Sequence, residues 1–197
     1  MVTQDDDGRI FNVATKRTAT VEDLYRFAGD GKAELVDEEL VVMSPTGHAH
    51  GRAVTQIIVS LHAYGRRTRR GEALGDSVGF LVHLANRRSF SPDAAFYTGP
   101  PFGARFIEGA PVFAVEVRSE GDYGPAAERA MAGKRADYFA AGTVVVWDVD
   151  VLRDRCLRVY RAADPQNATV YRCGEIAEAE PAVPEWTLPV DELFLPE

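Results

Sequence analysis

Two acidic residues and one lysine, far apart in the chain, have the side chains that phosphodiester chemistry requires. Asp93 follows a Ser-Pro pair at the start of a short apolar run, and Glu116 stands near the end of the apolar run 112–117. Lys134 lies on a predicted helix, one turn before Tyr138. Carboxylate oxygens bind hard divalent cations, and a nearby ammonium can steady an attacking water or the charge of a phosphate. A metal-dependent phosphodiester hydrolase uses this set of groups.

Length and composition are those of one soluble globular domain. The chain has 197 residues, of which 46% are hydrophobic and 26% charged. That is long enough to bury a core without disulfides. We expect a loosely structured segment over residues 1–18 and a single domain over residues 19–197. No apolar run approaches the roughly 18 residues that span a bilayer, and the first residues are acidic where a secretory signal is basic. The sequence therefore predicts a cytoplasmic protein without a membrane partner.

The net charge of −8 opposes nonspecific attraction to a polyanion such as DNA. Positive charge is nevertheless concentrated in the arginine pairs 66–67, 69–70 and 87–88. The first four of these arginines suit the solvated end of a helix, where cations favour the helix dipole. A role in following phosphates is the alternative.

Periodicity predicts an α/β or α+β fold, a mixed β-sheet flanked by helices, with N-terminal and C-terminal β-hairpins. Val54, Ile57, Ile58, Leu61 and Tyr64 follow the spacing of one helix face. Thr20 resembles a helix cap. The predicted helices are a short one after Thr20, one from about 50 to 69 and one over 126–141. The predicted strands are 33–36, 39–43, 73–84, 93–97, 112–117 and 143–149, followed by a hairpin turned at 163–167.

The site depends on the pairing of strands 93–97 and 112–117. If they pair antiparallel about a centre near Ala104 and Arg105, Asp93 and Glu116 lie opposite each other. This is the simplest register for the two strands.

An ordered series of short motifs resembles the Uma-two family of restriction endonucleases, in the PD-(D/E)xK nuclease superfamily. The resemblance runs from about Val21 to Phe194, and the order of the motifs is more specific than any one of them. The motifs are Glu34-Leu35-Val36-Asp37, Met43-Ser44-Pro45, His50, Pro92-Asp93, Glu116-Val117 with Ser119, Lys134 with Tyr138, Gly142, and Trp147 to Asp150.

The resemblance implies a restriction-endonuclease-like fold, an acidic metal site, DNA as substrate and a homodimer. Asp93 and Glu116 look like the ligands of Mg²⁺, for which Mn²⁺ can substitute. Glu34 resembles an additional acid, and Lys134 resembles a catalytic lysine moved from the strand to a helix. His50 matches a recurrent histidine without an assigned role.

One position departs from the superfamily signature. A lysine usually stands two residues after the strand glutamate, and here Arg118 takes that place. Arginine can hold phosphate but cannot serve as a base. We therefore predict Lys134 as the functional amine, Arg118 as a phosphate contact, and Tyr138 and His50 as residues that line the site.

Two other functions are compatible with the sequence. A catalytically weak or inactive module could use the same fold to bind DNA or protein, which the negative charge and Arg118 favour. A hydrolase of small phosphoesters is the third hypothesis. A zinc site is not predicted, because the four histidines lack the spacing of a four-ligand set.

Overall fold

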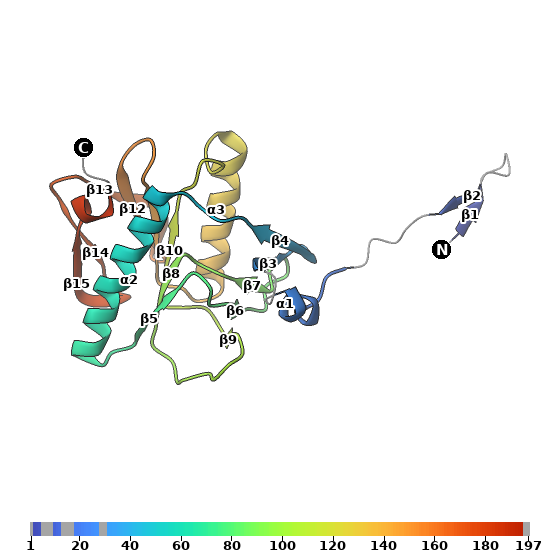
Figure 1. Cartoon of the computed structure of the whole chain (residues 1–197), viewed down its shortest axis with the longest axis horizontal. Helices are drawn as coiled ribbons and strands as arrows, with labels where there is room; N and C mark the ends of the chain where they lie inside the picture. The colour runs from blue at the N-terminus through green and yellow to red at the C-terminus, as the bar shows by residue number, and fades with distance from the viewer. Residues whose placement is uncertain (1, 5–9, 13–17, 28–30, 195–197) are drawn as a thin grey trace.

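A six-stranded mixed sheet forms the centre of this computed structural model, with one long helix on each face (Figure 1). The structure describes residues 2–4, 10–12, 18–27 and 31–194. In spatial order the strands of this sheet are β13 (Asp164–Arg172), β12 (Cys156–Arg161), β11 (Val145–Asp150), β10 (Phe113–Val117), β8 (Ala94–Tyr97) and β5 (Glu72–Gly75). Within this sheet β10 and β11 are parallel, and the other neighbours are antiparallel.

Helix α2 (His48–Thr68) covers one face of the sheet with the apolar stripe predicted from the sequence. It ends at Arg69, which adopts a left-handed conformation (φ 57°) and donates its N–H to the Gly65 carbonyl oxygen over 2.8 Å. Arg66 and Arg67 occupy the last turn and are exposed, where cations favour the helix dipole. The first part of the arginine cluster is therefore a solvated helix end.

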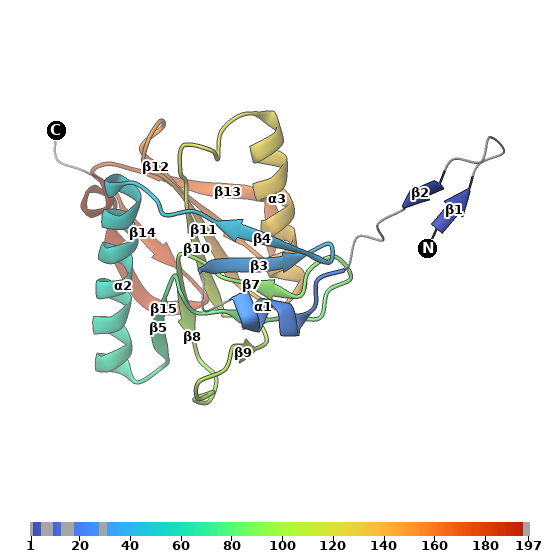
Figure 2. The ribbon, with the colours of Figure 1, turned by 45° about the vertical axis from the view of Figure 1, so that its right-hand side comes forward.

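Helix α3 (Pro125–Ala140) lies on the opposite face and connects the parallel strands β10 and β11. Proline at the first helical position fits there because its missing N–H has no partner in the first turn. Gly142, with φ 105°, turns the chain into the next strand. The two long helices stand on either side of the strands in Figure 2.

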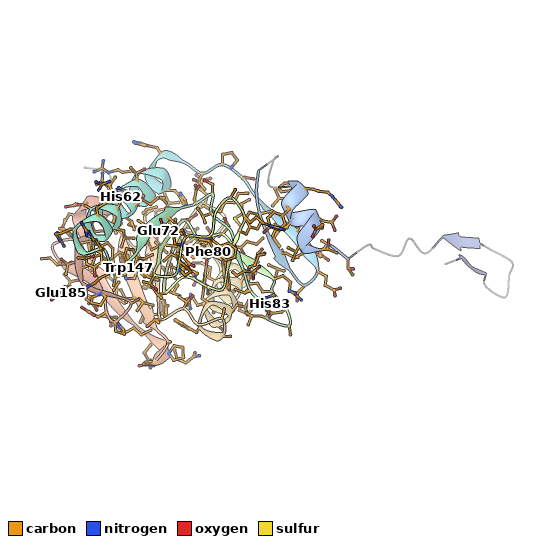
Figure 3. All side chains as sticks on the ribbon, turned by 90° about the horizontal axis from the view of Figure 1, so that it is seen from below. His62, Glu72, Phe80, His83, Trp147 and Glu185 are labelled. Atoms are coloured by element: carbon orange, nitrogen blue, oxygen red, sulfur yellow. The ribbon has the colours of Figure 1, made fainter. Side chains whose placement is uncertain are left out.

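The alternation of side chains along the strands divides the core between the two helices. Phe113, Val115 and Val117 pack in the core on the α2 side, and Ala114 packs with Tyr138 of α3. Side chains two residues apart share a face of a strand, so Glu116 belongs to the α3 side. Trp147 and Phe80, labelled in Figure 3, are fully buried in these two cores.

Smaller elements surround the sheet. β3 (Lys32–Val36) and β4 (Glu39–Met43) form the hairpin predicted around Asp37-Glu38, and Figure 2 shows it crossing between α2 and α3. The other elements are β1 (Val2–Gln4), β2 (Ile10–Asn12), α1 (Val21–Phe27), β6 (Phe80–Leu81), β7 (Ser89–Phe90), β9 (Ile107–Glu108), β14 (Ile176–Ala179), β15 (Val183–Pro189) and η1 (Val190–Leu193).

The predicted mixed sheet flanked by helices is confirmed, and one strand prediction is wrong. Residues 73–84 form two separate strands, β5 and β6, because a turn follows Gly75 and sends the chain into a second small sheet. Most of the segment 1–18 lies outside the described residues, although β1 pairs with β2. No described helix is long and apolar enough to cross a bilayer.

Candidate active site

The predicted register between β8 and β10 is confirmed. Val115 pairs with Ala94, and the Asp93 N–H donates to the Val115 carbonyl oxygen over 3.0 Å. Asp93 therefore lies opposite Glu116 on the neighbouring strand. The side chain of Glu116 belongs to the α3 face, and Asp93, which directly precedes β8, lines the same cleft as Glu116.

Lys134 connects acids from two different elements. Its Nζ atom lies 2.9 Å from Glu34 Oε1 on β3 and 2.9 Å from Glu116 Oε1 on β10. Tyr138, one turn further along α3, donates its hydroxyl to Glu116 Oε1 over 2.6 Å. The Tyr138 ring stacks on Phe90 with ring centroids 4.0 Å apart, which fixes the hydroxyl. The helix thus brings an ammonium and a hydroxyl to the same carboxylate.

Glu34 is buried and anchored to three groups. Arg87 Nη1 lies 2.5 Å from Glu34 Oε2, and the Ser91 N–H donates to Oε1 over 2.9 Å. Burial alone would raise the pKa of Glu34, but the charges of Lys134 and Arg87 outweigh it and lower the pKa. Glu34 is therefore a carboxylate that holds Lys134 in place.

Arg87, from the arginine pair 87–88, is buried and takes part in the site. Besides Glu34 it contacts Asp137, with 2.9 Å between Nε and Oδ2. This position could not be recognised from the sequence, because a buried arginine and a solvated one look alike in a short basic run.

Asp93 is held by a hydrogen-bond network that includes His50. Its Oδ2 atom accepts the Val117 N–H over 2.8 Å and lies 3.2 Å from His50 Nε2, while Lys32 Nζ lies 3.1 Å from Oδ1. Burial would raise the pKa of Asp93, yet the His50 hydrogen bond and the Lys32 charge bring it to about 2. Since a carboxylate only accepts, His50 Nε2 carries the hydrogen. Thr46 Oγ1, 2.9 Å from His50 Nδ1, fixes the ring.

Glu116 has the opposite electrostatic setting. Burial raises its pKa, repulsion from Asp93 and Glu34 adds to this effect, and the charge of Lys134 only partly offsets it. The same arrangement raises the pKa of Lys134, because attraction to Glu116 and Glu34 exceeds the cost of burial. A further cation near Glu116 would therefore stabilise its charged form.

Arg118 points into a separate charged network. Its Nε and Nη2 atoms donate to the two oxygens of Asp148 over 2.7 and 2.8 Å, and Nη2 also lies 3.1 Å from Glu128 Oε2. These hydrogen bonds raise the pKa of Arg118, and only 4% of its side chain is exposed. Arg118 thus joins the ends of β10 and β11 to the first turn of α3.

A cleft of about 1120 Å³ opens over these residues. Five cationic and seven acidic residues line it, which leaves an excess of two negative charges when histidine is neutral. The cations are Lys32, Arg87, Arg118, Lys134 and Arg135, and the acids are Glu34, Asp76, Asp93, Glu116, Glu120, Asp122 and Asp148. A bound divalent cation would balance this excess and favour an anionic substrate.

The donor set fits a magnesium ion better than zinc. Mg²⁺ is held by one or two carboxylates, with waters and substrate phosphate completing the shell. Asp93 and Glu116, adjacent on neighbouring strands, provide two such carboxylates. Within the described ranges no three His, Cys, Asp or Glu residues form a group suited to a metal. His62 and His83, labelled in Figure 3, are exposed on α2 and after β6, in separate parts of the molecule.

The fold defines a class of protein. It is similar to the crystal structure of a putative nuclease belonging to DUF820 from Anabaena variabilis ATCC 29413, with a TM-score of 0.69 over 83% of this chain and 90% of that one. Sequence identity is 16%, so the likeness shows the fold alone. The fold is thus a mixed α+β fold similar to that of this putative nuclease.

The chain belongs to the Uma2 family, whose family model matches residues 19–191 and is described as "Putative restriction endonuclease". No curated protein sequence matches the chain. The resemblance to the Uma-two family read from the sequence is confirmed, and the family supports a nuclease-like role.

Proposed function

We propose that this protein is a magnesium-dependent endonuclease that hydrolyses DNA phosphodiester bonds, with Mn²⁺ able to replace Mg²⁺. The observation that carries the proposal is the convergence of three acids and one amine from separate parts of the chain. Lys134 Nζ lies 2.9 Å from both Glu34 and Glu116, and Asp93 lies beside Glu116 on the next strand. The cleft above them has room for a phosphate and its sugars.

Asp93 and Glu116 would hold the cation. When bound, the cation supplies a water of lowered pKa and withdraws charge from the phosphate. Lys134 would orient that water or stabilise the negative charge that develops on the phosphoryl oxygens. Glu34 keeps the ammonium aimed at the site through its 2.9 Å contact, and Tyr138 holds Glu116 in one orientation.

His50 acts as a positioning residue in this mechanism. It donates to Asp93 Oδ2, so the other oxygen of Asp93 faces Lys32 and the cleft. Arg118 is a weaker candidate for contact with phosphate, because Asp148 and Glu128 engage its donors. The protein acts in the cytoplasm as a homodimer under this proposal, as nucleases of this fold often do.

The test is nicking of supercoiled DNA by purified protein in Mg²⁺. Wild type should convert the plasmid to the open form, and Asp93→Ala, Glu116→Ala and Lys134→Ala should each lose this activity. Glu192→Ala, which removes an exposed acid on η1, is the control and should nick at the wild-type rate. Nicking that survives all three site changes would refute the assignment.

A noncatalytic binding module is the second candidate. It is favoured by the pairing of each site acid with a cation of the protein, which gives a stable arrangement without metal. Titration with Mn²⁺ separates the two functions. A binding module does not bind Mn²⁺ through Asp93 and Glu116. The enzyme binds Mn²⁺ there, and Asp93→Asn or Glu116→Gln abolishes this binding.

A further inference from the structure

Lys32 contacts the candidate site from the β3–β4 hairpin. Its Nζ atom lies 3.1 Å from Asp93 Oδ1, and its side chain is 20% exposed at the wall of the cleft. Lys32 and Glu34 share one face of β3 because they are two residues apart. The structure gives them different partners, Asp93 for Lys32 and Lys134 for Glu34.

The two oxygens of Asp93 are unequally available. Oδ2 receives the Val117 N–H and His50 Nε2, which together use both of its lone pairs. Neither donor moves easily, because one is strand backbone and Thr46 anchors the other. Among the residues that the structure describes, Lys32 is the hydrogen-bond partner of Oδ1. A cation that binds Asp93 must therefore approach the oxygen that the ammonium of Lys32 already holds.

Lys32 is held by fewer carboxylates than Lys134. Its ammonium ends a flexible four-carbon stem and has a single carboxylate partner, Asp93. Lys134, in contrast, is fixed between Glu34 and Glu116. Two positive groups on one carboxylate oxygen repel each other, so a divalent cation at Oδ1 displaces the ammonium of Lys32.

We propose that Lys32 exchanges partners during the reaction: it holds Asp93 in the metal-free protein, and when a cation binds it passes to a phosphate oxygen of the substrate. This inference rests on the proposed nuclease function. Lys32 lines the same cleft as Asp93 and Glu116, so its released ammonium faces the space that the substrate enters. Lys32 is then a substrate-binding residue that lies outside the superfamily signature formed by Asp93, Glu116 and the position of Arg118.

Calorimetric titration with Mn²⁺ measures the first half of the proposal without any nuclease assay. If Lys32 covers Oδ1 about nine-tenths of the time, its removal strengthens Mn²⁺ binding about tenfold. Lys32→Met should therefore lower the Kd about tenfold. Lys32→Arg keeps a competing charge and should stay within about twofold of wild type. Arg88→Met removes an exposed charge and should also stay within about twofold.

Kinetics at saturating Mn²⁺ measure the second half. Lys32→Met should raise the KM for DNA several-fold, because the phosphate loses an ammonium partner, while kcat changes less. Circular dichroism of each variant establishes that the fold is retained. An unchanged KM would overturn the substrate-binding role of Lys32.

The outcomes of the titration separate this inference from the proposed function. If wild type binds Mn²⁺ and Asp93→Asn does not, but Lys32→Met binds no more tightly than wild type, only the role of Lys32 is refuted. If wild type, Lys32→Met and Asp93→Asn all give the same isotherm, both the metal-dependent function and the role of Lys32 are refuted.

Discussion

Replacing Lys134 by methionine removes the ammonium between the buried carboxylate of Glu34 and the partly buried carboxylate of Glu116, whose side chain is 20% exposed. Glu34 retains Arg87 and the Ser91 N–H, whereas Glu116 retains only the Tyr138 hydroxyl among its hydrogen bonds shown by the structure. Removing one partner of a buried ion pair costs about 3–5 kcal/mol. We therefore expect a large loss of stability at neutral pH, carried mainly by Glu116.

The pH dependence limits the size of this loss. The pKa of Glu116 is raised in the folded protein, so folding favours its protonated form. The stability that this protonation contributes is present at acid pH and is lost as the pH rises through the folded pKa. Without Lys134, Glu116 can escape the penalty by taking up a proton. From an ordinary pKa of 4.5, protonation costs about 4 kcal/mol at pH 7.5 and about 1.4 kcal/mol at pH 5.5.

Urea unfolding followed by circular dichroism in EDTA tests this reasoning. Lys134→Met should lose about 3 kcal/mol at pH 7.5, a Tm decrease of about 6–12 °C, and no more than about 1.4 kcal/mol at pH 5.5. Adding Glu116→Gln should recover most of the loss at pH 7.5, because the amide carries no charge. Arg129→Met on the exposed side of α3 should change stability by less than about 0.5 kcal/mol. Equal losses at both pH values would refute the argument.

Three further predictions concern the neighbours of this pair. The pKa of Asp93 falls from 3.8 to about 2 on folding, so its charged form contributes about 2 kcal/mol to stability, which wild type loses as the pH falls from about 4 to 2. Asp93→Asn should lack this contribution, and urea unfolding at a series of acid pH values checks it. Arg118→Met should cost about 3 kcal/mol or more in urea unfolding because the buried Asp148 loses two hydrogen bonds and keeps the longer, 3.6 Å contact with Arg135, and adding Asp148→Leu should restore part of it. His50→Ala should lower nicking by about 10–100-fold with the fold intact, as loss of a group that orients a metal ligand does.

The sequence predicts the main sheet and the position of the acids well, for local reasons. The apolar stripe of α2 and the Asp37-Glu38 turn are short-range patterns, and each element appears where they place it. The level pairing of Asp93 and Glu116 follows from one antiparallel register, which the structure confirms.

The contacts of the charged side chains could not be predicted, because partners far apart in sequence decide them. Lys32 pairs with Asp93, 61 residues further along the chain, and not with Glu34 on its own strand. Arg118 pairs with Asp148, a buried acid on the next strand, which the sequence does not indicate. Arg87, in a basic run, is buried against Glu34. No periodicity or local propensity distinguishes a buried ion pair from a solvated charge.

The connection between the two parallel strands has a consequence for how such a site can vary. Parallel neighbours require a crossover, and here α3 is that crossover, so its inner face must lie over β10. An amine carried by the helix and an amine carried two residues after Glu116 would approach the same carboxylate from above and from the side. The topology therefore allows the amine to come from either of two positions, the helix or the strand. A chain with arginine two residues after Glu116 can still place a lysine beside that carboxylate from the helix.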